Sequence, residues 1–401
     1  MMAAACKDNE TNQQQLLAVP EVAQRLLYLL EVKVKGQGKQ IKSSCLSLLY
    51  EISLTEAGRV ALVERMDLVR LILALFPLMK SSNRYNNTAA VVLNNIALEK
   101  QAKIALRNKI DGILPALEDL LSKGTAASIV GVACTTATNL AADVRIRNKM
   151  AANSSMWQAL TKLVACYSAT GQTQTLADVL GLCVNISSGV DTACLASLDV
   201  STTTAAWGVL AKSSVSSAGS GEGSGGKATT HQGDGDQTSS HNSTDDDSSS
   251  SPAGEQSGEQ ERDITVRTLV LLSNILPVNS ASVDVMSENH RAEKIVEFTK
   301  CQDCLIYKPA LKCLSALTRS SHDVRLLVVE NKGLSMLLSR LKDEDEAVAG
   351  NAALCLSHLT KDNTQLVGKH SDGKQTLAGS VCSRLVKTNI VQKLLTLARD
   401  G

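Results

Sequence analysis

Aromatic residues are scarce in this chain: among 401 residues there are 2 Trp, 2 Phe and 5 Tyr, or 2%. Proteins that stack nucleic-acid bases on aromatic rings, or that cage a quaternary ammonium group, need more of them. All-β proteins also rely on aromatic residues in their strands. Hydrophobic residues still make up 44% of the chain, so its core consists mainly of Leu, Ala, Val and Ile, which favours packed helices.

An excess of one charge is also missing, because 41 basic residues face 40 acidic ones. This balance argues against a nucleic-acid or membrane-surface partner. The 11 cysteines are odd in number and scattered, which indicates free thiols in a reducing cytosol. The longest apolar run, residues 68–79, contains Arg70 and Pro77 and is too short to span a bilayer. We therefore expect a soluble, cytoplasmic protein.

Catalytic and cofactor motifs are absent as well. The sequence contains no GxxxxGK[ST], GxSxG or HExxH pattern. Cys301 and Cys304 form a close pair, but no second close pair follows them as in structural zinc sites. We predict no enzyme activity, no cofactor and no metal.

The dominant positive feature is a repeat. A run of small and branched residues ends in an apolar anchor seven times, at Ile52, Ile96, Leu140, Ile186, Ile275, Leu317 and Leu359. Successive anchors are 44, 44, 46, 89, 42 and 42 residues apart. The long interval contains a polar insert, so the underlying period is about 42–46 residues, as in armadillo or HEAT arrays.

One unit illustrates the expected local structure. Residues 88–98 carry apolar side chains at helical spacing, a short basic segment follows at 100–109, and 113–121 form another helix after the turn at Asp111 and Gly112. The order of short, longer and longest helix resembles the three-helix armadillo unit. We therefore predict an all-α fold, a right-handed superhelical solenoid of armadillo type with about seven repeats.

Residues 213–263 are rich in Ser, Gly and Asp, with ten acidic residues and two basic ones. This composition cannot bury enough apolar surface to offset the entropy lost on ordering. We predict a disordered acidic insert at 213–263, within one solenoid formed by residues 1–212 and 264–401. The remainder then carries 39 basic and 30 acidic residues.

Both ends of the array look incomplete in the sequence. The first unit shows only two helical segments, at 22–32 and 41–53. The last apolar helix, at 391–399, has no neighbour to cover it, although terminal repeats normally have a polar outer face. We expect the chain to be a fragment.

Asparagine stands directly before four of the anchors, as Asn95, Asn139, Asn185 and Asn274. An amide offers two donors and one acceptor, so one per repeat could hold an extended backbone. In the armadillo family, which these repeats resemble, the third helix lines a concave groove and an Asn at this position clamps a peptide. The alternative is a structural Asn that caps or hydrogen-bonds within its own repeat.

Two departures limit this comparison. Nuclear-import armadillo receptors carry Trp one helical turn before the Asn, whereas this chain has Val91, Thr135, Gly181 and Val270. Recognition of a Lys-rich import signal is therefore not expected. The last two repeats carry Ala316 and His358 in place of Asn.

Basic residues recur in two successive short segments, at Lys100, Lys103, Arg107, Lys109, Arg145, Arg147 and Lys149. The simplest interpretation is a solvated repeat edge. The alternative is a surface for an acidic protein partner, with the acidic insert as an autoinhibitor.

The phrases VAGNAALCL at 348–356 and RLVKTNIVQKLL at 384–395 are more specific. They resemble the C-terminal armadillo half of a family that joins a tetratricopeptide domain to an armadillo array. This resemblance implies a non-enzymatic, cytoplasmic scaffold in the assembly of axonemal dynein arms. Its groove would hold an extended client segment, with dynein-arm subunits or chaperones as partners.

Overall fold

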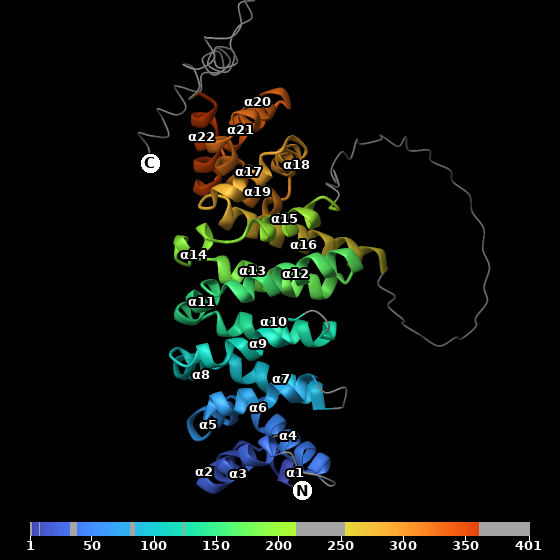
Figure 1. Cartoon of the computed structure of the whole chain (residues 1–401), viewed down its shortest axis with the longest axis vertical. Coiled ribbons are helices and arrows are strands. Elements are labelled where there is room, and N and C mark those ends of the chain that lie inside the picture. Colours follow the sequence, from blue (N-terminus) through green and yellow to red (C-terminus); the bar gives the residue numbers. More distant parts are fainter. Residues whose placement is uncertain are drawn as a thin grey trace, which may run out of the picture.

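The structure, a computed structural model, describes residues 2–7, 9–32, 38–80, 85–122, 125–213 and 253–360. These residues form 22 α-helices and one short 3-10 helix, with no strand among them. The helices stack in chain order into an elongated rod (Figure 1). The predicted fold class, an all-α solenoid of armadillo type, is confirmed.

The helices repeat as seven triplets. The first helices of the triplets are α2 (Glu10–Ala18), α5 (Glu56–Arg65), α8 (Lys100–Leu106), α11 (Val144–Ala151), α14 (Thr192–Ala196), α17 (Ser280–Met286) and α20 (His322–Glu330). The second helices are α3 (Pro20–Glu31), α6 (Leu68–Lys80), α9 (Leu114–Leu120), α12 (Ser154–Thr170), α15 (Val200–Leu210), α18 (Asn289–Lys300) and α21 (Gly333–Arg340). The third helices are α4 (Gly38–Leu54), α7 (Tyr85–Leu98), α10 (Ala127–Leu140), α13 (Thr173–Ser187), α16 (Ala253–Ile275), α19 (Cys304–Ser320) and α22 (Glu346–Thr360). A short helix, α1 (Met2–Cys6), precedes them, and the 3-10 helix η1 (Ile110–Gly112) lies between α8 and α9.

The core is continuous from repeat to repeat. Each third helix packs on the third helix of the next repeat, from α4 through to α22. All seven anchor residues lie in this core, and each is at most 3% exposed. A single helix could not bury such a stripe alone, so neighbouring repeats complete one another's core.

Side-chain caps fix where many helices begin. Thr55, Asp143 and Asp303, among others, accept hydrogen bonds from backbone N–H groups in the first turn of α5, α11 and α19. These bonds satisfy donors that have no partner inside a helix. At the other end of α12, Gly171 adopts a left-handed conformation (φ +71°), which allows the chain to turn into α13.

Two sequence-based expectations are wrong in detail. The first unit is not incomplete at its start, because α2 supplies its short first helix; the sequence of α2 is too polar to show a helical pattern. The insert is not irregular up to residue 263, because α16 begins at Ala253. The rest of the predicted insert, 214–252, and the predicted helix at 391–399 lie outside the described residues.

Candidate protein-binding face

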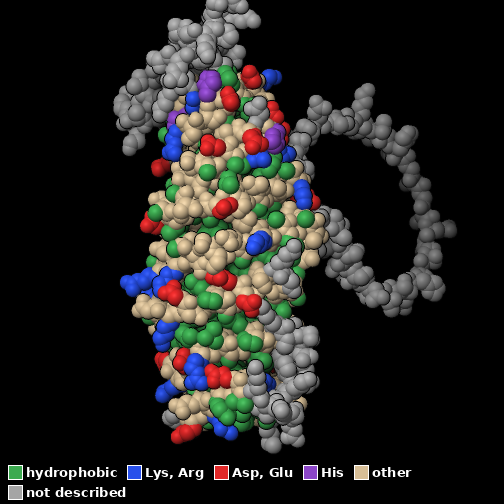
Figure 2. Space-filling view, in the orientation of Figure 1, with side chains coloured by type: hydrophobic (Ala, Val, Ile, Leu, Met, Phe, Trp, Pro, Cys, Tyr) green, Lys and Arg blue, Asp and Glu red, His purple; other side chains and the backbone are tan. Residues whose placement is uncertain are grey.

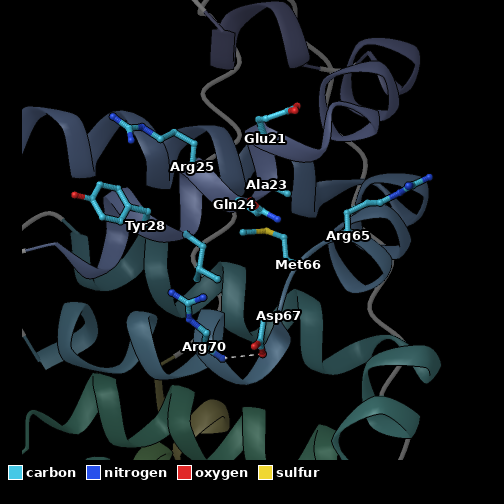
Figure 3. Close-up of a pocket in the computed structure, with 10 residues that line it drawn as sticks. Glu21, Ala23, Gln24, Arg25, Tyr28, Arg65, Met66, Asp67 and Arg70 are labelled. Atoms are coloured by element: carbon cyan, nitrogen blue, oxygen red, sulfur yellow. Dashed lines mark hydrogen bonds between the residues drawn. The ribbon is translucent and has the colours of Figure 1, made fainter.

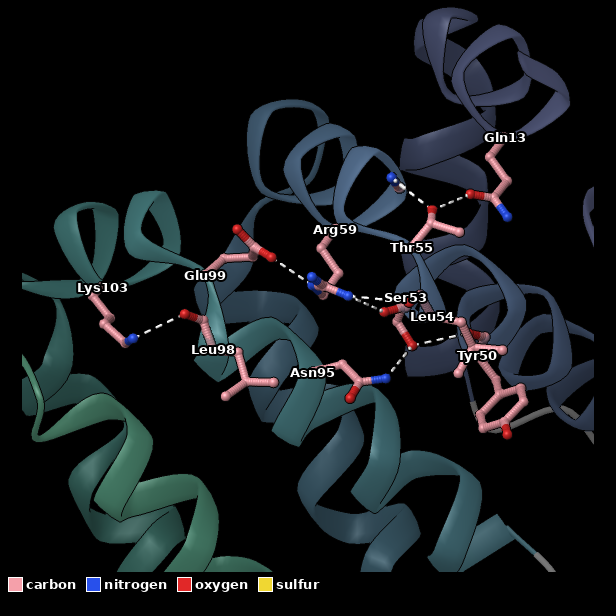
Figure 4. Close-up of polar contacts among 11 residues, drawn as sticks. Gln13, Tyr50, Ser53, Leu54, Thr55, Arg59, Asn95, Leu98, Glu99 and Lys103 are labelled. Atoms are coloured by element: carbon pink, nitrogen blue, oxygen red, sulfur yellow. Dashed lines mark hydrogen bonds and ion pairs between the residues drawn. The ribbon is translucent and has the colours of Figure 1, made fainter. Parts of the chain in front are cut away.

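The four asparagines before the anchors lie half-buried on the third helices, where each contacts the preceding repeat. The Asn95 Nδ2 donates to Ser53 Oγ at 3.1 Å (Figure 4), and the Asn139 Nδ2 donates to Asn94 Oδ1 at 2.8 Å. The Asn185 Nδ2 donates to the Thr138 carbonyl at 3.2 Å. These amides therefore form a ladder across the repeats.

Asn274 extends the ladder past the insert. Its Nδ2 lies 3.0 Å from Ser187 Oγ and 3.2 Å from Ser188 Oγ in the preceding repeat. Its Oδ1 accepts a long hydrogen bond from Lys312 Nζ at 3.5 Å. A purely structural Asn was expected to hydrogen-bond within its own repeat, but these four asparagines bond to the preceding repeat.

This arrangement leaves part of each amide for a ligand. In Asn95, Asn139 and Asn185 the amide nitrogen faces the neighbouring repeat, and within the described residues the Oδ1 atom has no hydrogen-bond donor. An acceptor of this kind, repeated once per repeat, matches the N–H groups of an extended chain. The same asparagines can thus connect neighbouring repeats through their amide nitrogens and present a row of hydrogen-bond acceptors to a peptide.

The positions one turn before these asparagines differ among the repeats. Val91 and Thr135 are exposed. At Gly181 the space that a side chain would fill is taken by the Arg267 guanidinium, whose Nη1 donates to the Ala177 carbonyl at 2.8 Å. On the face formed by the third helices, this position is therefore exposed in the second and third repeats. In the fourth repeat, at Gly181, it is covered by Arg267.

A carboxylate lies beside this arginine. Asp178 packs over Gly131 of the preceding third helix, at a point where a Cβ atom would be only 2.8 Å from its Oδ2. Burial raises the pKa of the Asp178 carboxyl, although a hydrogen bond from Gln174 and the charge of Arg267 act in the opposite direction. Asp178 and Arg267 therefore place charge in the middle of a face that is mostly uncharged toward the N-terminus.

Four of the seven predicted basic-edge residues have structural partners. Arg107 Nε lies 2.7 Å from Asp143 Oδ2, and Lys149 Nζ lies 2.6 Å from Asp111 Oδ2, so both bridge adjacent repeats. Lys103 Nζ donates to the Leu98 carbonyl at 2.9 Å (Figure 4).

The fourth, Arg147, donates a long hydrogen bond to the Ala141 carbonyl at 3.5 Å. Like Lys103, it places a cation where a third helix ends, which complements the helix dipole. The other three residues, Lys100, Lys109 and Arg145, are exposed and have no such partner in the part of the chain that the structure describes. Basic side chains gather at the left edge of the molecule at the height of α8 and α11 (Figure 2).

A pocket between α3 and α6 is a weaker candidate. Ala23, Leu27 and Met66 are buried in its lining, with Arg25 and Arg65 at its rim. The guanidinium groups of these two arginines point in opposite directions (Figure 3). They do not converge on one ligand, so we assign no site here.

The remaining predictions concern metals, disulfides and membranes. Ten cysteines are free thiols in the described ranges, while Cys382 lies outside them. No group of three or more His, Cys, Asp or Glu suited to a metal occurs among the described residues, and the Cys301–Cys304 pair is part of no such group. Within the same residues, no helix is long and apolar enough to cross a membrane.

Three-helix repeats, a stack of third helices and one continuous core give this chain the armadillo-type solenoid fold. The chain is similar to tetratricopeptide repeat protein 12 of Homo sapiens, with 27% identity over 404 residues that cover 98% of this chain and 47% of that protein. Tetratricopeptide repeat protein 12 of Mus musculus is 25% identical over 400 residues, with the same coverage. The chain thus spans about half the length of the curated relatives it matches. No protein-family model matches the chain.

Solved structures agree with this class at the level of the fold. A structure that concerns a phosphorylation switch in the interaction between cadherin and beta-catenin has a TM-score of 0.61 and 14% identity, covering 97% of this chain and 63% of that one. An engineered protein has a TM-score of 0.55 and 14% identity, covering 88% of this chain and 74% of its own.

Proposed function

We propose that this protein is a non-enzymatic scaffold that holds an extended segment of a client protein against its third-helix face. The observation that carries the proposal is the row of half-buried asparagines, whose Oδ1 atoms accept no hydrogen bond from the described residues in three successive repeats. In an armadillo-type solenoid this face corresponds to the peptide-binding groove. An extended peptide offers one N–H group every second residue on each side, which suits acceptors repeated along a groove.

The finer part of the proposal follows from the resemblance to tetratricopeptide repeat protein 12. We propose a cytoplasmic factor in axonemal dynein arm assembly, with dynein-arm subunits or chaperones as partners. The similarity over 98% of this chain supports this assignment. This chain spans 47% of that protein, so the partners of the whole protein are proposals for this chain.

The test is affinity purification of the tagged chain from ciliated cells, with mass spectrometry of the co-purifying proteins. The variant is the triple Asn95→Ala, Asn139→Ala, Asn185→Ala. Each backbone hydrogen bond to a client contributes about 0.5–1.5 kcal/mol, so three lost bonds should reduce recovery of dynein-arm subunits at least about tenfold.

A matched control separates client binding from repeat packing. Ser53→Ala and Ser187→Ala remove acceptors used by Asn95 and Asn274 but leave every amide in place. We expect this double variant to lose some thermal stability and to keep its partners. Equal recovery of dynein-arm subunits with wild type and triple variant would contradict groove binding. Failure to recover any ciliary protein would contradict the dynein assignment and leave the scaffold proposal to be tested on other partners.

A further inference from the structure

Three large apolar side chains are exposed beside the basic residues of the third and fourth repeats. Leu98 ends α7 and is 50% exposed, Ile104 on α8 is 40% exposed, and Val144 at the start of α11 is 49% exposed. Single exposed apolar residues are common on protein surfaces, but a group of them often marks an interaction site.

Two contacts join the segments that carry these side chains. The Arg107–Asp143 ion pair joins the end of α8 to the start of α11, with Ile104 one turn before Arg107 and Val144 directly after Asp143. The Leu98 carbonyl accepts the hydrogen bond from Lys103, the residue before Ile104. Leu98, Ile104 and Val144 thus belong to segments that meet at one inter-repeat junction.

The cations at the same junction are not neutralised. The side chains of Lys100, Lys109 and Arg145 have no hydrogen bond or ion pair within the described residues. Three carboxylates at this junction are already engaged, since Glu99 pairs with Arg59, Asp111 with Lys149 and Asp143 with Arg107. Lys100 and Ile104 are four residues apart on α8, so they share one helix face. The junction therefore combines an apolar centre with an uncompensated positive rim.

We propose that Leu98, Lys100, Ile104, Lys109, Val144 and Arg145 form a second docking surface, the basic–apolar edge, for an acidic amphipathic helix of a partner protein. An apolar stripe on that helix would cover the centre, and carboxylates beside the stripe would meet the rim. The chain's own acidic insert lacks the apolar stripe, since residues 214–252 contain only Val215 among large aliphatic residues. A separate partner fits this edge better than the insert does.

Binding of a designed peptide tests the proposal directly. The probe is a fluorescein-labelled helix of about 18 residues with Leu at positions i, i+3, i+4 and i+7 and Glu beside them. A second peptide has the same composition in scrambled order, so that charge is kept and the stripe is lost. Fluorescence anisotropy with the full chain should show saturable binding of the first peptide and at least about tenfold weaker binding of the second.

Variants of the chain locate the site. Ile104→Ser with Val144→Ser, and Lys100→Gln with Arg145→Gln, should each weaken binding about tenfold, and the charge pair should also reduce its salt dependence. Leu73→Ser and Arg25→Gln are matched controls, because both residues are exposed elsewhere on the molecule. We expect these controls to bind as the wild type does.

The triple asparagine variant distinguishes the basic–apolar edge from the groove. Because its substitutions lie outside the edge, it should bind the designed peptide as the wild type does. The proposal is overturned if the scrambled peptide binds equally well, if the edge variants bind as tightly as the controls, or if no peptide binds. It is also overturned if the chain binds vesicles of anionic lipid through these residues and ignores the acidic helix.

Discussion

At the scale of single residues, Asp143 connects two repeats through one carboxylate. Its Oδ2 accepts from Arg107, and its Oδ1 accepts from the backbone N–H groups of Arg145 at 3.0 Å and Ile146 at 3.4 Å. Burial alone would raise the pKa of this carboxyl, but these hydrogen bonds outweigh burial and the pKa is lowered. The ionised form is therefore the one that the folded state stabilises.

This leads to a pH-dependent prediction. A carboxyl whose pKa is lower in the folded state stabilises the fold above the unfolded-state pKa, and this stabilisation is lost as the pH falls below about 4. Asp143→Asn keeps a cap acceptor but removes the charge, so it should cost about 1–3 kcal/mol at pH 7 and progressively less toward pH 2.5. Urea unfolding followed by circular dichroism across this pH range measures the difference.

Asp111→Asn is the control for that experiment. Its side chain is 68% exposed and its pair with Lys149 lies at the surface, where such pairs contribute at most about 1 kcal/mol. If Asp111→Asn lowered the free energy of unfolding as much as Asp143→Asn does, burial of the Asp143 carboxylate would not explain its contribution to stability.

The sequence predicted residue positions better than residue contacts. Ile52 and Leu359 were recognised as anchors because apolar residues at a fixed period must face a shared core, and both are buried. The Arg107–Asp143 bond was not predicted, because its two residues lie 36 positions apart. A search for opposite charges at the repeat period of about 42–46 residues would also have missed it, because the bond joins two different helices of neighbouring repeats. Leu98 and Ile104 were missed because nothing in a helical pattern shows that an apolar residue faces solvent.

At the scale of elements, the sequence pattern does not predict the polar helices. Helix α2 has the sequence ETNQQQLLA and the first half of α16 is AGEQSGEQERD, so neither shows an apolar stripe. Their helical state depends on context. In α16, Arg262 makes two hydrogen bonds to the Asp303 carboxylate, at 2.5 and 3.0 Å. Asp303 belongs to the next repeat, so this part of α16 is fixed by a contact that composition cannot reveal.

The insert provides a prediction at the same scale. Ser213 Oγ accepts a hydrogen bond from Thr265 Oγ1 at 2.9 Å. The last described residue before the insert therefore lies beside the middle of α16. Residue 253 lies twelve helical positions before Thr265, or about 18 Å along the axis. A Gly/Ser linker of about ten residues, which reaches roughly 33 Å, can therefore replace residues 214–252.

This replacement should leave the repeats folded. The composition of residues 214–252 predicts a disordered segment, so shortening it should reduce the entropy cost of loop closure and raise stability by about 1 kcal/mol. Differential scanning calorimetry of both proteins measures the change. A decrease of several degrees in Tm would instead mean that the insert stabilises the body through contacts of its own.

At the scale of the whole molecule, the repeat period was the strongest signal in the sequence. Seven anchors at nearly constant spacing predicted an array, and seven triplets of helices are present. In such an array each repeat contacts mainly its neighbours, so stability is approximately the sum of repeat and interface contributions. The position of a defect along the array should then matter more than its chemistry.

Two matched core substitutions test this view. Ile52 in the first repeat and Ile186 in the fourth are both 0% exposed, and replacement by Ala leaves a similar cavity that costs about 2–5 kcal/mol. Ile52→Ala should release only the first one or two repeats, because the other interfaces survive its loss. Ile186→Ala weakens the packing of the fourth repeat against both of its neighbours. It should therefore lower the unfolding temperature of the entire chain. Hydrogen exchange with mass spectrometry distinguishes the two, since protection should fall over residues 9–80 in the first variant and over most of the array in the second. Equal loss of protection along the whole chain in both variants would show that the solenoid unfolds as one unit and that its ends are not independently mobile.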